Sequence, residues 1–483
     1  MIDIKQIREN PETFKKAAID KNISADIDRL LELDSTIKEA KQNLQAIATE
    51  KNKLGKLIPK ISDTEKEITL VKLAMLKEQE NIQNQGIEGC EYELNKLMLL
   101  VPQPTDDDVP VGKDDTENVE IKRVGEIRQF DFEPKDHVQL GLALGIIDIE
   151  RGVKLAGTRS YFLKGDGALL HWAVLRFAMD FMVGRGYVPM SVPVLMKDEA
   201  MKGTGFFPGS EDQTYRTKED QPELAENGTS FSPSIKVTYR TEKDQVVTGN
   251  DTETRSSPTF EGQDEAMPRT VFDQAEKGQL NLAGTAEVPL TAYRMGEILD
   301  SEELPLKYVA LSSCFRREAG AAGKDTYGLY RIHQFDKIEQ VVICKNSTEE
   351  SNKFHEEILA NAEAVMQALE LPYRVVVVCT GDLGRGQAKK YDIEAWMPSR
   401  GNYCETHSAS KFYEFQARRM NLRYKDPATK KNLFCHTLNN TVIASPRILV
   451  PILELYQNSD SSITVPKVLR PYMAGKEKIV KRE

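Results

Sequence analysis

Residues 314–339 read "CFRREAGAAGKDTYGLYRIHQFDKIE" and carry the most informative pattern of this chain. Charged and aromatic side chains occupy every second position of its second half: Arg331, His333, Phe335, Lys337 and Glu339. Arg316 and Glu318 are likewise two residues apart in the first half. Successive side chains of a strand point to opposite faces, so each set shares a face if both halves are strands. The stretch therefore predicts two antiparallel strands with charged residues along one face.

Two interpretations of this charged face are open. Alternating charge is common on the solvated face of an antiparallel sheet, which is the simpler interpretation. A phenylalanine among the charges and the glycine-rich link EAGAAGK favour a ligand site instead. Arginines bind phosphate oxygens through planar forks, an aromatic ring offers a surface for a base, and acids can bind an amino group. The pattern therefore indicates a nucleotide site with an amine-bearing second substrate, and the link lacks the G-x-x-x-x-G-K-[ST] phosphate loop.

Composition and charge narrow the class of protein. The chain has 483 residues, which is more than one simple domain needs. Its formal net charge of −10 argues against nonspecific nucleic-acid binding but allows a local basic patch. The first residues, MIDIKQIREN, contain no apolar leader, and the run VVVVC at 375–379 is far too short to span a membrane. Six cysteines are scattered without a framework pattern. We therefore expect a reduced, cytoplasmic protein with no membrane partner.

Residues 27–58 carry the clearest periodicity of the chain. Positions three and four residues apart form one seam, interrupted only by a lysine: Leu30, Leu33, Ile37, Ala40, Leu44, Ile47, Lys51, Leu54 and Ile58. This heptad spacing is typical of a helix packed against a partner helix. Pro59 breaks the pattern, and a second, poorer stripe follows with Ile68, Val71, Met75 and Ile82. Residues 1–110 are therefore expected to form an antiparallel α-helical hairpin, a coiled coil.

The half of this hairpin nearest its turn is basic. Between Lys38 and Lys60 there are six lysines and two acids. A basic tip on an acidic chain indicates an anionic partner, and a nucleic acid is the natural candidate. The candidate contacts are Lys38, Lys41, Lys51, Lys53 and Lys56. A coiled coil that serves only oligomerisation is the alternative that this pattern leaves open.

Residues 111–483 mix helices with strands. A helical pattern runs from 167 to two glycines, Gly184 and Gly186, and another lies at 350–370. Strand-like runs follow at 307–315, 337–345, 373–381 and 391–398. Their alternation favours antiparallel pairing, and the repeating strand–helix rhythm of a parallel sheet is missing from the sequence. The predicted fold class is α+β, with an antiparallel β-sheet flanked by helices after the helical hairpin.

One segment of this second domain differs from the rest in composition. Residues 211–280 are poor in apolar residues and carry 15 acids against 8 basic residues. The sequence QTYRTKEDQ at 213–221 recurs as VTYRTEKDQ at 237–245. Two copies are too few for a solenoid. We therefore expect an acidic surface insertion at about 217–280, partly disordered.

Several segments, taken in order, resemble the motifs of a known family. GYVPMSVPVL resembles motif 1 of the class II aminoacyl-tRNA synthetases, with Pro193 at the dimer-forming position. Residues 315–339 resemble motif 2 with its loop, and HTLNNTVIASPRILVPILELYQ resembles motif 3. GTAEVPL carries a Thr-x-Glu, Thr285 and Glu287, like the serine-recognition element of the seryl-tRNA synthetases. With a hairpin similar to that family's tRNA-binding arm, nearly the whole chain apart from 217–280 resembles a seryl-tRNA synthetase of the common type.

The resemblance implies a serine–tRNA ligase that uses ATP. The carboxylate of serine would attack the α-phosphate, giving seryl-adenylate and pyrophosphate, and the 3′-terminal adenosine of tRNA(Ser) would then take the seryl group. The selenocysteine tRNA, tRNA(Sec), is a further candidate substrate. The resemblance also implies a homodimer in which the arm acts across subunits. Two alternatives stay open: a ligase that loads an amino acid onto a carrier protein, and a noncatalytic tRNA-binding paralogue.

Matching positions imply roles for individual residues. Those of the ATP site would be Arg316, Glu318, Arg331, Phe335, Glu405, Ser408 and Arg447, with Arg316 and Arg447 catalytic. Arg316 would hold the α-phosphate, Glu318 the adenine amino group and Arg331 the distal phosphates. Phe335 and Arg447 would lie on opposite faces of adenine, while Glu405 and Ser408 would hold Mg²⁺. The serine pocket would be lined by Thr285, Glu287, Glu339 and Thr441.

Two cysteines and two histidines raise the question of a zinc site. Cys404 and His407, with the later pair Cys435 and His436, have residue types and a spacing that could suggest zinc. An atypical branch of the seryl-tRNA synthetases uses zinc for serine. This chain instead carries the Thr-x-Glu and the helical arm of the common type. We therefore expect Mg²⁺ and no zinc.

Overall fold

The computed structural model describes residues 1–217, 279–319 and 327–481. The chain divides into two compact units, residues 1–216 together with 280–483, and residues 217–279. Nearly all of the predicted acidic insertion at 217–280 therefore lies outside the described residues. The first unit contains the helical hairpin and the large sheet.

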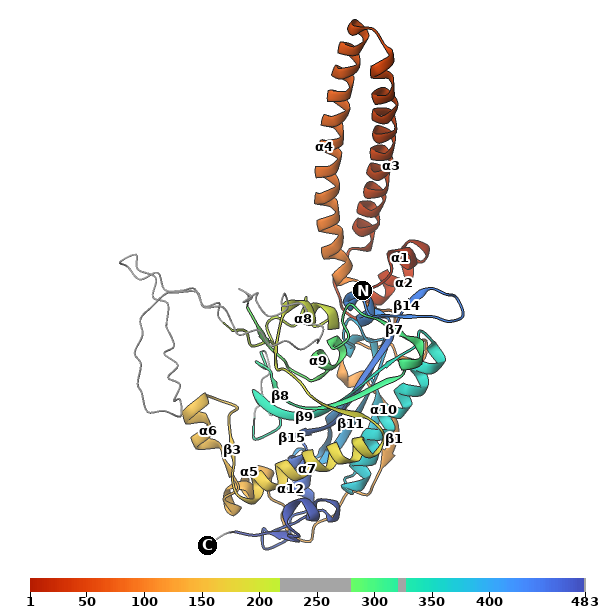
Figure 1. Ribbon diagram of the computed structural model, residues 1–483. Helices are drawn as coiled ribbons and strands as arrows, with labels where there is room; N and C mark the ends of the chain where they lie inside the picture. Colours follow the sequence, from red (N-terminus) through yellow and green to blue (C-terminus); the bar gives the residue numbers. More distant parts are fainter. Residues whose placement is uncertain (218–278, 320–326, 482–483) are drawn as a thin grey trace, which may run out of the picture. The chain divides into compact units, whose positions relative to one another are not determined.

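Two long helices form the predicted hairpin. Helix α3 (Ile27–Leu57) leads through the short η1 (Ile58–Lys60) into α4 (Asp63–Leu100), and the two helices lie antiparallel, side by side (Figure 1). Every position of the seam predicted at 30–58 is buried or half-buried. Its one lysine, Lys51, reaches Glu80 of α4 at 2.5 Å. The seam therefore packs as a heptad pattern should, with an ion pair at its polar position.

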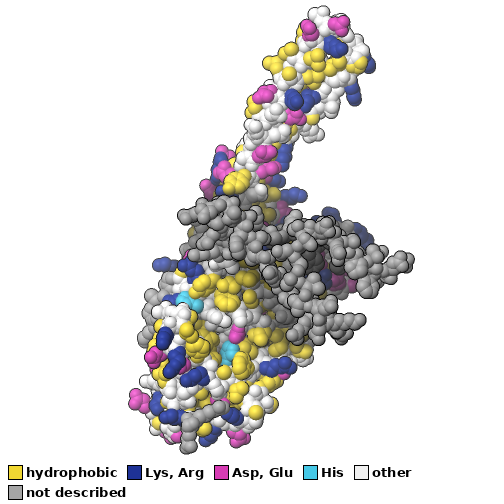
Figure 2. Space-filling model, turned by 60° about the vertical axis from the view of Figure 1, so that its left-hand side comes forward, with side chains coloured by type: hydrophobic (Ala, Val, Ile, Leu, Met, Phe, Trp, Pro, Cys, Tyr) yellow, Lys and Arg dark blue, Asp and Glu magenta, His cyan; other side chains and the backbone are white. Residues whose placement is uncertain are grey.

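The second predicted stripe does not pack against α3. Ile68, Val71, Met75 and Ile82 of α4 are each about 60 to 70% exposed. Hydrophobic side chains are accordingly visible on the arm among its acidic and basic residues (Figure 2). Helix α4 instead turns a sparser set of residues inward, with Ile87 and Met98 buried on it. Gly86 and Gly89 lie within the continuous helix.

The base of the arm is joined to the rest of the first unit by an apolar cluster. Helices α1 (Ile4–Glu9) and α2 (Pro11–Asp20) contribute Ile7 and Phe14 to it. Ile27, Leu30 and Met98 of the arm pack there with Phe412 and Phe415, which are more than 300 residues later in the sequence. Burial of such side chains is worth about 1.5–3 kcal/mol each. The arm is therefore anchored at its base.

Eight strands form the large sheet. Their order is β1 (Val119–Val124), β10 (Tyr373–Val377), β11 (Lys389–Met397), β12 (Asn402–Tyr413), β15 (His436–Ser445), β9 (Gln334–Cys344), β8 (Leu306–Phe315) and β4 (Val188–Ser191). All neighbours are antiparallel except β4 and β8, which are parallel. The predicted α+β class with a largely antiparallel sheet is confirmed.

Helices cover one face of this sheet. On β9, Ile338 and Val342 belong to the same core cluster as residues of α7 (Asp166–Gly184), α10 (Thr348–Ala368) and α12 (Leu449–Leu455). Gln340, on the same face, donates a hydrogen bond to the carbonyl of Ile358 in α10 at 3.0 Å. The odd-numbered residues of β9 therefore point to the opposite face. Helix α7 is long and apolar enough to cross a membrane, but half of it is buried inside the protein, as in a core helix.

Smaller elements complete the fold. The remaining helices are α5 (His137–Leu144), α6 (Ile149–Ala156), α8 (Asp198–Thr204), α9 (Glu287–Ala292) and α11 (Phe415–Met420), and the short 3₁₀ turns are η2 (Asp115–Glu117), η4 (Ser301–Glu303), η6 (Thr380–Asp382), η7 (Pro398–Arg400) and η8 (Lys467–Met473). Four small sheets pair β2 (Ile147–Asp148) with β3 (Phe162–Leu163), β5 (Leu195–Met196) with β6 (Asn281–Leu282), β13 (Arg423–Lys425) with β7 (Ile298–Asp300) and β14 (Asn432–Phe434), and β16 (Ile463–Thr464) with β17 (Lys478–Ile479).

The strands of the opening stretch are shorter than predicted. β8 ends at Phe315 and β9 begins at Gln334, so Arg316, Glu318, Arg331 and His333 all lie outside the ladder. The reason is a change of partner. Arg316 N–H still bonds across the hairpin to the carbonyl of His333 at 3.0 Å, but Arg317 N–H donates to the carbonyl of Gln213 at 2.9 Å. The strand geometry therefore explains only the common face of Phe335, Lys337 and Glu339.

Candidate functional site

A single pocket gathers ten of the eleven residues that the sequence predicted for ATP and serine. They are Thr285, Glu287, Arg316, Glu318, Phe335, Glu339, Glu405, Ser408, Thr441 and Arg447. Its floor is the face of β9, β12 and β15 that the helices leave open. Arg331 is outside the lining, where its Nη1 lies 3.2 Å from Glu318 Oε2.

One end of the pocket combines arginines with aromatic rings. The guanidinium carbon of Arg316 lies 5.3 Å from the ring centre of Phe335, and its Nε donates to the carbonyl of Gly284 at 3.3 Å. The guanidinium carbon of Arg447 lies 4.5 Å from the ring centre of Tyr330. Fixed cations beside flat rings can hold phosphate oxygens and a base together. This end of the pocket is therefore suited to a nucleotide.

The other end of the pocket is lined by buried acids and hydroxyls. Glu339 is fully buried and forms a close ion pair with Lys337. The Lys337 ammonium also donates to Thr285 Oγ1 at 2.8 Å. Asn439 Nδ2 donates to Glu339 Oε1 at 2.9 Å and to Glu287 Oε2 at 3.0 Å. Two carboxylates carry more negative charge than one lysine neutralises. This end of the pocket can therefore take a second cation, such as a substrate ammonium.

Glu287 is the carboxyl group with the most altered acidity at this end. Its burial, and then the negative charge of Glu339, raise the pKa of Glu287 to about 7. A hydrogen bond from the amide of Gln416 to Glu287 Oε1, at 2.8 Å, works in the opposite direction. A buried carboxyl group that titrates near neutrality responds strongly to a cation placed beside it.

The sequence-based site lacked several lining residues, three of which contact residues that it contained. Lys337 shares the β9 face with Phe335 and Glu339, so the alternation indicated its position but no role. Asn439 follows Leu438 and lies in the polar run NNT of β15, which is its sequence signal. Tyr330 follows the glycine-rich link and carries no pattern of its own. All three hold residues that the sequence did predict.

Glu405 and Ser408 of β12 are the candidate Mg²⁺ ligands. Both line the pocket, and carboxylate and hydroxyl oxygens are hard donors of the kind that Mg²⁺ takes beside phosphates. Desolvation raises the pKa of Glu405, but the charges of Arg447 and other cations outweigh it and hold that pKa below its ordinary value. The carboxylate is therefore ionised at neutral pH, as a metal ligand must be. These residues fit Mg²⁺.

The candidate zinc residues have other partners. His407 Nε2 lies 3.0 Å from the carbonyl of Val442, and its Nδ1 is 2.8 Å from Thr406 Oγ1. His436 Nδ1 is 2.6 Å from Ser351 Oγ. Burial lowers the pKa of each histidine to about 4 and raises the pKa of the Cys435 thiol to about 12. Within the described ranges, no three His, Cys, Asp or Glu side chains are placed to share a metal ion.

Known proteins match this chain over nearly its whole length. Residues 1–104 match the seryl-tRNA synthetase N-terminal domain, and residues 270–456 match the tRNA synthetase class II core domain (G, H, P, S and T). A serine–tRNA ligase of Deinococcus radiodurans is 42% identical over 99% of this chain and 98% of its own length. A serine–tRNA ligase of Rubrobacter xylanophilus is 37% identical over 99% of both chains.

Solved structures agree with the sequence relatives. A seryl-tRNA synthetase from Pyrococcus horikoshii complexed with ATP matches with a TM-score of 0.82 at 34% identity, covering 100% of both chains. A cytoplasmic serine–tRNA ligase from Naegleria fowleri in complex with AMP matches with a TM-score of 0.79 at 28% identity, over 100% of this chain and 99% of that one.

Proposed function

The chain belongs to the seryl-tRNA synthetase family, and we propose that the pocket over β9, β12 and β15 is the place where it joins serine to ATP. The chain is a serine–tRNA ligase, which activates serine with ATP as seryl-adenylate and transfers the seryl group to tRNA. The observation that carries the assignment of the pocket is its division into two ends. Arginines and rings line one end, and buried acids with hydroxyls line the other.

The arginine end would bind ATP. In the proposed arrangement Arg316 holds the α-phosphate, Phe335 and Arg447 take the two faces of adenine, and Glu318 accepts from its amino group. Arg331 reaches the distal phosphates from the edge of the pocket, beside Glu318. Charge develops around the phosphorus during the reaction, so preorganised cations should supply much of the rate enhancement. Arg316, fixed to the carbonyl of Gly284, meets that requirement.

The acidic end would bind serine. Glu339 and Glu287 would receive the ammonium group, while Thr285 and Thr441 are placed for the hydroxyl and the chain of serine. A site built to hydrogen-bond a hydroxyl rejects an analogue that lacks it, because its buried polar groups would then be unpaired. Alanine is therefore excluded by chemistry, whereas threonine must be excluded by lack of room for its methyl group.

Glu405 and Ser408 would hold Mg²⁺ beside the phosphates. The ion would neutralise the charge of phosphate oxygens that Arg316 and Arg331 do not contact. Ser408 and Glu405 come from one strand, β12, so their spacing is fixed by the sheet. The side chain of Arg447 lies 3.8 Å from Glu405 and keeps that carboxylate oriented toward the pocket.

Residues 1–110 would be the tRNA-binding domain and 111–483 the catalytic domain. Of the five candidate lysines, Lys41 and Lys51 are ion-paired with Glu91 and Glu80 of α4. Lys38, Lys53 and Lys56 are exposed, and the described part of the chain offers them no ion pair. We therefore assign most of the phosphate contacts on the arm to these three lysines.

A homodimer in the cytoplasm completes the proposal. The edge strand β4 has no neighbour on one side within the described residues. Val188 on this strand is 54% exposed, Leu311 on the adjacent β8 is 47% exposed, and Trp172 of α7 is 61% exposed. An unpaired edge and exposed apolar side chains favour association with a second copy. The arm of each subunit would then serve the active site of the other.

Pyrophosphate exchange tests the assignment of the pocket. With wild-type protein, ATP–pyrophosphate exchange across a panel of amino acids should depend on serine. Arg316→Ala should lower the serine-dependent rate by roughly 10²-fold or more, as expected for a lost transition-state contact. Arg317→Ala is the matched control, because Arg317 is exposed and outside the pocket lining. Exchange by Arg316→Ala within a few-fold of wild type would remove Arg316 from the phosphate site.

A further inference from the structure

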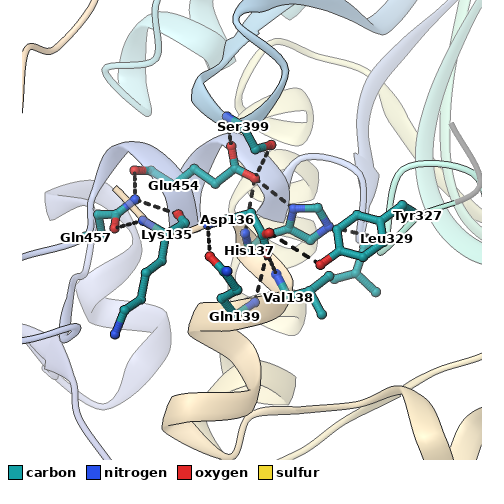
Figure 3. A network of polar contacts seen from close by, with 10 residues as sticks. All are labelled: Lys135, Asp136, His137, Val138, Gln139, Tyr327, Leu329, Ser399, Glu454 and Gln457. Carbon is teal, nitrogen blue, oxygen red and sulfur yellow. Dashed lines mark hydrogen bonds and ion pairs between the residues drawn. The ribbon is translucent and has the colours of Figure 1, made fainter. Parts of the chain in front are cut away.

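A buried carboxylate outside the pocket lining links three elements of the fold, α5, η7 and α12 (Figure 3). Glu454 of α12 has no exposed surface. Its Oε1 accepts hydrogen bonds from the backbone N–H of His137 at 3.1 Å, from His137 Nδ1 at 2.7 Å and from the hydroxyl of Ser399 at 2.7 Å. Its Oε2 accepts from the backbone N–H of Ser399 at 2.9 Å. Four donors satisfy an ionised carboxylate, so α5, η7 and α12 are fixed to one another.

The second nitrogen of His137 binds the segment that follows the glycine-rich link. His137 Nε2 lies 3.2 Å from the backbone nitrogen of Leu329. A backbone N–H can only donate, so Nε2 must present its lone pair, and we assign the ring proton to Nδ1. The neutral ring therefore donates to Glu454 with one nitrogen and accepts from Leu329 with the other. In Figure 3 the ring lies between these two partners.

The residues next to Leu329 fit the same surface. Gly328 has φ +69°, and a Cβ atom there would lie 2.1 Å from His137 Nε2. A residue other than glycine would both strain the backbone and push the segment off the ring. The hydroxyl of Tyr327 donates to Asp136 Oδ2 at 3.3 Å, one residue before His137. Three consecutive residues, 327–329, thus rest on the first turn of α5.

The same segment leads directly to the nucleotide end of the pocket. The carbonyl of Tyr330, one residue beyond Leu329, accepts a hydrogen bond from Arg447 Nε at 3.2 Å. The ring of Tyr330 lies under two guanidinium groups, those of Arg447 at 4.5 Å and Arg400 at 3.9 Å. Arg400 follows Ser399 in η7, and Arg447 precedes α12, so both arginines are carried by elements that Glu454 also holds. The contacts close a ring from Glu454 through His137 and Tyr330 back to α12.

We propose that His137 is a positioning residue for ATP, which sets the place of Arg447 through Leu329 and Tyr330. The inference rests on the proposed role of Arg447 at the adenine ring. Any buried backbone N–H needs an acceptor for stability, so the inference is carried by the position of this acceptor. Here the acceptor lies one residue from the carbonyl that holds Arg447. Loss of that acceptor should therefore weaken ATP binding while leaving serine binding unchanged.

Two substitutions separate the two nitrogens of the ring. His137→Asn places an amide near the position of Nδ1, so a donor to Glu454 is kept and the acceptor for Leu329 is lost. His137→Gln places its amide near the position of Nε2, so an acceptor for Leu329 is kept and the donor to Glu454 is lost. Gly328→Ala is an independent variant, because it displaces the segment without removing any group that contacts Glu454.

The measurements are the KM for ATP and the KM for serine in pyrophosphate exchange, with thermal unfolding of each variant. We expect His137→Asn and Gly328→Ala to raise the KM for ATP roughly ten- to a hundredfold, as a misplaced binding group does, with the KM for serine within about twofold. His137→Gln should unfold at a lower temperature and keep a KM for ATP near that of wild type. Should His137→Asn fail to fold, Gly328→Ala supplies the same comparison.

Two controls separate this inference from the proposed function. Arg447→Ala must itself raise the KM for ATP; an unchanged value would contradict the ATP assignment and not only the role of His137. His355→Asn alters another buried histidine, which contacts Ala409 and Tyr391 outside the pocket lining, and should lower the unfolding temperature without changing the KM for ATP. A KM for ATP that follows the unfolding temperature across all variants, or is unchanged in both His137→Asn and Gly328→Ala, would overturn the inference.

Discussion

Two carboxyl groups share the acidic end of the pocket with one lysine. Lys337 pairs with Glu339 and reaches Thr285, while Asn439 bridges Glu339 and Glu287. Three ionisable groups this close cannot change charge independently. Lys337 offsets one negative charge, and the second carboxyl group, Glu287, keeps a raised pKa of about 7 because it is buried and faces Glu339. An arriving ammonium would supply the missing positive charge.

The raised pKa of Glu287 predicts that serine binding improves as the pH rises. An ammonium favours the ionised carboxylate, which exists above the pKa of about 7 and is lost as the pH falls through it. The KM for serine should therefore fall by about tenfold between pH 6 and pH 8, the effect of one group titrating midway. Glu287→Gln should flatten this dependence, and the KM for ATP serves as the internal control. A KM for serine that is flat in wild type, or equally steep in Glu287→Gln, would contradict the role of Glu287.

The residues of the site divide into those with a sequence signal and those without one. Arg316, Glu318 and the Thr-x-Glu could be predicted because they lie in motifs with a fixed spacing. Arg331 was predicted in the pocket but lies beside Glu318 at its edge. His137 and Glu454 could not be predicted, since they lie 317 residues apart and meet only when α5 and α12 pack. Contacts of that separation are a property of the tertiary structure.

At the scale of elements, the sequence predicted strands with a regular alternation of side chains and missed β12 and β15. β12 and β15 lie at the centre of the large sheet, yet their sequences carry ETHSAS and NNT. One face of each strand lines the pocket, and on β15 the amide of Asn440 on the other face donates to Ile358 of α10 at 2.6 Å. Function and buried hydrogen bonding therefore replace the apolar alternation on which strand prediction depends. The two strands beside the glycine-rich link likewise end early, because the N–H of Arg317 bonds to the carbonyl of Gln213 and not across the hairpin.

Shortening the arm tests its separate role in charging. We would delete residues 46–85 and join Gln45 to Gly86 through a short Gly/Ser turn, which keeps the apolar base formed with Phe412 and Phe415. Serine-dependent pyrophosphate exchange should be within about twofold of wild type, since the deleted residues are outside the pocket lining and their loss removes only uniform binding of tRNA. Charging of tRNA(Ser) should fall by about 10²-fold or more through lost phosphate contacts.

A matched pair of variants locates the contacts within the arm. Substituting the exposed Lys53 and Lys56 together by alanine should weaken tRNA charging and make it less dependent on salt. Substituting Lys41, which is ion-paired with Glu91, should have a smaller effect. Unchanged charging by the shortened arm would instead favour a coiled coil that serves only oligomerisation.

At the scale of the whole molecule, the acidic insertion should be dispensable for activation. Its flanks are already close: Leu282 N–H donates to the carbonyl of Tyr215 at 2.8 Å. A shorter connection costs little, because loop closure changes by only about 0.6 kcal/mol per doubling of length. Replacing residues 222–278 by a short Gly/Ser linker should therefore preserve dimer formation, measured by light scattering, and serine activation. A loss of the dimer, or of activation by more than about 10²-fold, would show that the catalytic domain depends on the insertion.

A heterodimer of two variant subunits distinguishes an arm that acts across the dimer from one that acts within its own subunit. One differently tagged subunit carries the shortened arm and an intact pocket, and the other carries an intact arm and Arg316→Ala. Neither homodimer should charge tRNA, because one lacks arms and the other lacks the proposed phosphate contact. If the arm acts across the dimer, the purified heterodimer has one productive combination, the arm of one subunit with the pocket of the other, and should charge tRNA at about half of the wild-type rate. If the arm acts within its subunit, charging stays at the level of the homodimers. Pyrophosphate exchange is the control, since it should be about half of wild type in either case. Exchange of subunits during the assay can regenerate only homodimers that do not charge tRNA.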